Sequence, residues 1–80
     1  MFTTNEFVSS VKAMGYEVER DSNILIINSG DRLMGKVNVT KVDDFFIGYA
    51  LPSEINTPKR LELLTYIEDY ALTPLDKRGN

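Results

Sequence analysis

The spacing of hydrophobic and polar positions changes twice along the chain, from a helical period to an alternating one and back again. The first apolar stripe has the spacing of one helix face and consists of Phe7, Val8, Val11 and Met14. Residues 3–6 before it suit a capping box that ends on Glu6, with Phe2 placed to pack on Phe7. Gly15 suits the left-handed position after a helix. We predict a helix from Thr3 or Thr4 to Met14 or Gly15.

Between residues 16 and 50 the pattern is typical of β-strands. Tyr16 and Val18 alternate with Glu17 and Glu19, which indicates a strand with one buried face. Further strands are expected at residues 24–27, 32–39 and 45–50, separated by polar turns. Gly30 supplies the positive φ of a tight hairpin, and Gly35 marks a bulge or an interruption in the third strand. The pattern therefore predicts four antiparallel strands.

A helical period returns after residue 56. Thr57 followed by Pro58 is typical of an N-cap and the first helical position. The apolar positions that repeat at helical spacing are Leu63, Leu64, Ile67, Tyr70 and Ala71. The helix should end near Leu72, and we expect the last residues, 77–80, to fray. The order helix, four-stranded antiparallel meander, helix predicts a single two-layer α+β domain spanning residues 1–80.

Two of the predicted strands, at residues 24–27 and 45–47, have apolar side chains on both faces. Two helices in an 80-residue chain can cover only one face of the sheet. We expect the helix-facing set to be Ile24, Ile26, Leu33, Val37, Phe45 and Ile47. The opposite face would then carry a candidate partner-binding patch made of Leu25, Ile27, Met34 and Phe46. We expect this patch to bind a protein partner or a second copy of the chain in a homodimer. The alternative is that the linker around Leu51 and Ile55 folds over it.

Charge and composition narrow the possible partners. Nine Lys and Arg against twelve Asp and Glu give a net charge of −3, which disfavours non-specific binding to nucleic acid phosphates. The chain has no Cys, which fits a reducing compartment, and we expect the cytoplasm. The start of the chain lacks a basic segment followed by an apolar one, and no stretch reaches the roughly 20 apolar residues of a membrane span. We therefore expect neither secretion nor membrane insertion.

The sequence offers little for catalysis or for a cofactor. Without His or Cys there are no nitrogen or sulfur ligands for zinc, haem or iron-sulfur clusters, and no base that titrates near neutral pH. The acid-containing stretches at 21–23 and 43–44 are more typical of polar turns than of calcium or magnesium sites. The isolated glycines form no phosphate-binding loop. We expect no enzyme activity, no cofactor, no metal and no small-molecule substrate.

Both ends of the chain carry a family resemblance. The stretches concerned are Asn5-Glu6-Phe7-Val8, Val11-Lys12-Ala13-Met14-Gly15-Tyr16 and Tyr70-Ala71-Leu72-Thr73-Pro74-Leu75-Asp76-Lys77-Arg78. With these stretches the chain resembles small uncharacterised proteins encoded by phages and prophages of Gram-positive bacteria. The resemblance implies a phage accessory protein that binds a host protein as an inhibitor or modulator, and it implies no site residues. The alternatives are a nucleic-acid-associated protein and a structural subunit of a phage assembly.

Overall fold

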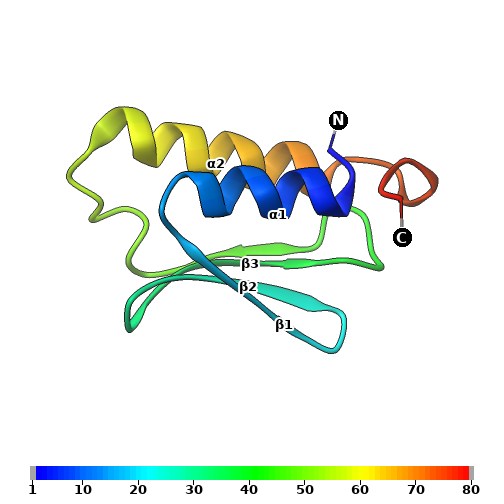
Figure 1. Cartoon of the computed structure of the whole chain (residues 1–80), viewed down its shortest axis with the longest axis horizontal. Helices are drawn as coiled ribbons and strands as arrows, with labels where there is room; N and C mark the ends of the chain where they lie inside the picture. Colours follow the sequence, from blue (N-terminus) through cyan, green and yellow to red (C-terminus); the bar gives the residue numbers. More distant parts are fainter. Residues whose placement is uncertain (1, 80) are drawn as a thin grey trace.

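The computed structural model describes residues 2–79 and shows the predicted two-layer α+β fold. In chain order the elements are α1 (Thr4–Ala13), β1 (Glu17–Asp21), β2 (Ile24–Ser29), β3 (Arg32–Asn38), β4 (Phe45–Ile47), α2 (Thr57–Ala71) and a 3₁₀ turn, η1 (Leu75–Lys77). Figure 1 shows α1 and α2 side by side on one face of the sheet, with the start of α1 and η1 at the same end of the molecule. The opposite face of the sheet carries no helix in the described part of the chain.

Short turns fix the register of the antiparallel meander, whose strand order is β1-β2-β3-β4. Ser22 and Asn23 alone separate β1 from β2, so that Asp21 pairs with Ile24. Ser22 has a φ of 57°, which brings its backbone into the left-handed region. Each later pair in this hairpin follows by counting outward from the turn.

The helix starts follow local capping rules. The Thr3 hydroxyl accepts from the Glu6 amide at 3.1 Å and the Glu6 carboxylate accepts from the Thr3 amide at 3.0 Å, which confirms the predicted capping box. The rings of Phe2 and Phe7 lie 6.2 Å apart, as predicted for a contact across the cap. The cap of α2 was predicted one residue too late, because the side chain of Asn56, rather than Thr57, accepts from the amide of Lys59 at 3.2 Å.

The core lies between the helices and one face of the sheet, and it corrects the predicted faces of β2. Leu25 and Ile27 are 3% and 0% exposed, whereas Ile24 and Ile26 are partly exposed. Ile27 pairs with Val18, which packs against the core. Directly paired residues share a face. The prediction that Leu25 and Ile27 point away from the helices is therefore wrong, because the register puts them on the same face as Val18.

A β-bulge moves Met34 into the core as well. The register of β2 and β3 shifts from Ile27 with Gly35 to Asn28 with Leu33, so Met34 is the extra residue. Met34 is buried, and its predicted place on the outer face is wrong for this reason. The predicted irregularity at Gly35 is confirmed, because the register shift begins directly beside this residue. A Cβ at position 35 would lie 3.0 Å from the Ile67 side chain.

The C-terminal segment is docked rather than frayed as far as Gly79, and Asn80 lies outside the described residues. Arg78 is fully buried, with its guanidinium 4.5 Å above the ring of Tyr70. Its three nitrogens donate to four backbone carbonyls at 2.8–2.9 Å, namely those of Asn38, Val39, Ala71 and Thr73. The Arg78 carbonyl accepts from the Thr4 amide at 2.7 Å. Arg78 thus joins the ends of β3 and α2 to the start of α1.

Candidate protein-binding face

The outer face of the sheet is the side away from α1 and α2, and its middle is one row of paired residues. Glu19 on β1 pairs with Ile26 on β2, Ile26 with Lys36 on β3, and Lys36 with Phe46 on β4. All four side chains share one face because directly paired residues point the same way. We call these four residues the central row. It holds two apolar side chains, one anion and one cation.

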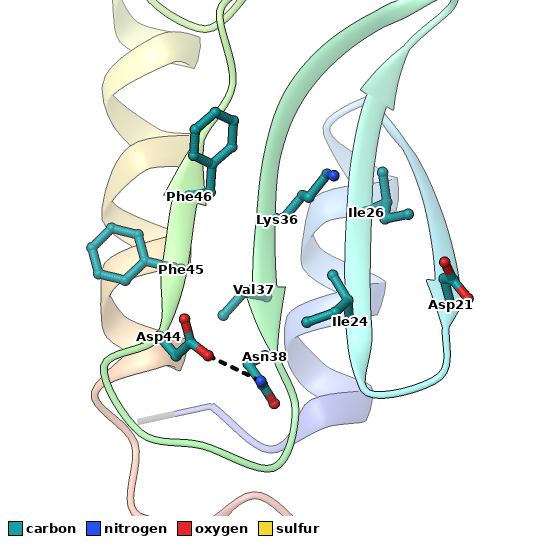
Figure 2. A pocket seen from close by; sticks show the side chains of 9 residues that line it. All are labelled: Asp21, Ile24, Ile26, Lys36, Val37, Asn38, Asp44, Phe45 and Phe46. Atoms are coloured by element: carbon teal, nitrogen blue, oxygen red, sulfur yellow. Dashed lines mark hydrogen bonds between the residues drawn. The ribbon is translucent and has the colours of Figure 1, made fainter.

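The next row of the outer face lies near the turns and is more polar. It contains Asp21, Ile24, Asn38 and Asp44, where Asp21 pairs with Ile24 and Ile24 with Asn38. The Asn38 amide group donates to the Asp44 carboxylate at 3.0 Å, which is the dashed line in Figure 2. The Asn38 side-chain oxygen accepts from the Thr40 amide at 2.9 Å. These bonds hold the β3–β4 loop beside the row.

The two rows enclose an open groove of about 230 Å³. Figure 2 shows Ile24, Ile26, Lys36 and Phe46 projecting from the three strands β2, β3 and β4 on the side that faces the viewer, with the helices behind. The Phe46 side chain is 54% exposed. Lys36 is exposed between Ile26 and Phe46, so a cation sits within an otherwise apolar strip.

Of the four residues predicted for this face, only Phe46 lies on it. Leu25, Ile27 and Met34 belong to the core, and Ile24 and Ile26 take their place on the open side. The sequence contained a signal for this exchange. Val18 is flanked by Glu17 and Glu19, so it is the inward residue of β1, and a two-residue turn at 22–23 carries its orientation to Ile27.

The linker between β4 and α2 does not line the groove. Leu51 is buried in the core and Ile55 is 94% exposed, so the alternative in which this linker folds over the outer face is wrong. Instead the linker is anchored on the helix side. The Tyr16 hydroxyl donates to the Glu54 carboxylate at 3.2 Å, and the Lys59 ammonium lies 4.6 Å from the Tyr16 ring centre. Burial, followed by the nearby Glu54 charge, raises the pKa of Tyr16 to about 12.

Other shifted titratable groups belong to local structure rather than to a reaction centre. Hydrogen bonds from the Thr3 backbone and hydroxyl lower the pKa of Glu6 at the cap of α1. The backbone amide of Asn56 lowers the pKa of Glu54 in the linker. A hydrogen bond with Glu62 raises the pKa of Tyr66 on α2. All these groups lie on the helix side, away from the groove.

A second depression lies between β4 and α2. It is mainly apolar, with one cation at its edge, and is lined by Ile47, Leu51, Pro52, Arg60, Leu61 and Leu64. Leu61 is 52% exposed, nearly the same as Phe46. The two residues therefore form a matched pair of exposed apolar side chains on different surfaces.

Residues 2–79 contain no cluster of three or more acidic side chains placed to hold a metal ion. None of the helices described for this chain is long and apolar enough to cross a membrane. Comparison with protein-family models, with curated proteins and with solved structures finds no match to the chain. The resemblance to phage and prophage proteins therefore stays a prediction, and the outer face of the sheet is the structural feature from which a function can be inferred.

Proposed function

We propose that the protein is a non-catalytic binding module that contacts another protein chain through the outer face of its sheet. The observation that carries the proposal is the placement of Ile24, Ile26 and Phe46 together on a face that neither helix nor linker covers. A contiguous apolar surface with a polar rim is typical of a protein interaction site. Aromatic side chains such as Phe46 often supply the main contacts of an interface.

The charges on this face favour protein over nucleic acid. Asp21 and Asp44 line the groove, and Glu19 lies next to Ile26 in the central row, so these carboxylates would repel phosphates. Lys36 is the single cation among the groove-lining residues. The proposal includes no reaction, because the groups with shifted pKa values belong to the α1 cap, the linker and the surface of α2. The family resemblance gives the proposal its setting: a phage accessory protein in the cytoplasm of a bacterial host.

Site-specific photo-crosslinking in bacterial cells tests this function. A photoreactive phenylalanine analogue is placed at position 46 in one variant and at position 61 in the other. Because Phe46 and Leu61 are equally exposed, chance collisions label both variants alike. Strong protein adducts from position 46 and weak ones from position 61 support the proposal. Equal labelling of both positions, or no adduct from position 46, would contradict it.

A further inference from the structure

The central row carries opposite charges on the two sides of its apolar centre. Glu19 on β1 and Lys36 on β3 are the two neighbours of Ile26 on β2. Adjacent strands of a sheet are about 4.8 Å apart. The anion and the cation are therefore displaced by one strand spacing in opposite directions from Ile26.

This arrangement is complementary to itself. A two-fold axis that lies between two stacked sheets and runs along β2 exchanges the positions of β1 and β3. Ile26 then meets Ile26 of the second copy, and Lys36 of each copy faces Glu19 of the other. Two-fold interfaces require such a self-complementary patch, in which every contact between different residues occurs twice.

The second row is compatible with the same axis. Ile24 meets Ile24 of the second copy, and Asp21 faces Asn38, whose amide group also donates to the Asp44 carboxylate at 3.0 Å. Phe46, one strand further out, extends past the β1 edge of the second copy and shields the new ion pairs from water. Stacked sheets about 10 Å apart leave room for these side chains to interdigitate.

We propose that the occupant of the outer face is a second copy of this chain, in a two-fold dimer in which Lys36 of each copy pairs with Glu19 of the other. This inference rests on the proposed function and names its partner. A strongly acidic partner would be repelled by Glu19, Asp21 and Asp44, and a partner with only basic side chains would place a like charge opposite Lys36. The central row, with one anion and one cation about an apolar centre, is matched by the same row turned by the two-fold axis.

Charge reversal gives a direct test by sedimentation velocity over a micromolar concentration range. The unaltered chain should form a dimer. Lys36→Glu and Glu19→Lys should each weaken the dimer by about tenfold or more, because each places like charges opposite each other at two contacts. The control Lys12→Glu makes the same charge change on α1 and should leave the dimer unchanged. Circular dichroism checks that all variants are folded.

Mixing the two single variants is the most specific part of the sedimentation experiment. In a mixed dimer, the acid introduced at position 36 of one chain faces the lysine introduced at position 19 of the other, and the unaltered Glu19 faces the unaltered Lys36. The mixture should therefore form a mixed dimer as tight as the original, while each variant alone stays largely monomeric. The double variant carrying both changes should dimerise with itself.

Three results overturn the inference: a chain that stays monomeric, single variants that dimerise normally, or a mixture that does not associate. Each of these results rejects the second copy as the partner but leaves the proposed binding function to be tested separately. Crosslinking from position 46 to a different protein, with a monomeric chain, would retain a binding role for the face and reject the second copy as its partner. Adducts of twice the chain mass would support both the binding role of the outer face and the second copy as its partner.

Discussion

Ile27 on the covered face of the sheet is fully buried between β2 and the helices, whereas its neighbour Ile26 on the outer face is partly exposed beside Lys36. The two residues have the same side chain and lie on the same strand, but their side chains point to opposite faces of the sheet. Packing removes Ile27 completely from water, while Ile26 keeps part of its surface in water until another surface covers it. The difference indicates that the covered face maintains the fold and that the outer face is available for binding.

Arg78 gives the largest expected effect, because it closes the covered side at the end of β3 and α2. Arg78→Ala removes four hydrogen bonds from a charged donor to backbone carbonyls and should reduce the free energy of unfolding by about 4 kcal/mol or more, at about 1.5–3 kcal/mol for each such bond. Urea unfolding followed by circular dichroism measures the loss.

Two control variants test whether the loss of stability is specific to the Arg78 guanidinium. Lys77→Ala, at an exposed neighbouring position, should change the free energy of unfolding by less than about 0.5 kcal/mol. Arg78→Lys keeps the charge but loses the planar set of donors, so its free energy of unfolding should lie between those of Arg78→Ala and Lys77→Ala. Equal stability of Arg78→Ala and Lys77→Ala would show that the tail contributes nothing to the covered side.

Ile27→Ala and Ile26→Ala test the two faces directly. Ile27→Ala should reduce the free energy of unfolding by about 2–4 kcal/mol, because it leaves a cavity in the core. Ile26→Ala should cost less than Ile27→Ala, about 1–2 kcal/mol in the isolated chain, since part of the Ile26 side chain is already in water. The dimer should respond in the opposite order, with Ile26→Ala weakening it more. A larger stability loss for Ile26→Ala would reverse the assignment of faces.

The capping box of α1 contributes a smaller effect. Thr3→Ala removes the side-chain acceptor for the Glu6 amide and should destabilise the chain by about 1 kcal/mol. Ser9→Ala, on the exposed side of the same helix, is the matched control and should have little effect. Thermal unfolding of the two variants makes the comparison, and identical midpoints would contradict the role of the cap.

The last expected effect is confined to alkaline pH and arises from Tyr16 on the covered side. The pKa of Tyr16 is about 12 in the folded chain against 10.0 for the unperturbed group, so the folded state holds its proton more tightly. This contribution to stability is complete below pH 10 and is lost as the pH rises towards 12. Tyr16→Phe should therefore show a shallower fall in urea midpoint between about pH 9 and 11 than the original chain. Parallel pH profiles of the two proteins would remove Tyr16 as the cause.

Local rules account for much of what could be predicted. The capping box at Thr3 and Glu6 depends only on residues three apart, and the strand pattern depends on neighbours in the chain. An irregularity near Gly35 could be predicted, but its effect on the direction of Met34 could not be predicted. The direction of a bulged residue depends on how the partner strand is paired. The role of Arg78 could not be foreseen, since its acceptors include carbonyls 39 and 40 residues away.

The sequence by itself determined the order of elements, the α+β class and the excess of apolar strand positions over what two helices can cover. Only the tertiary structure decided which positions face outward. In a run such as residues 24–27, where every side chain is apolar, hydrophobicity does not distinguish the two faces, and the choice falls to the register imposed by the turn at 22–23. That register buried Leu25 and Ile27, left Ile24 and Ile26 partly exposed, and placed Glu19 and Lys36 on either side of Ile26.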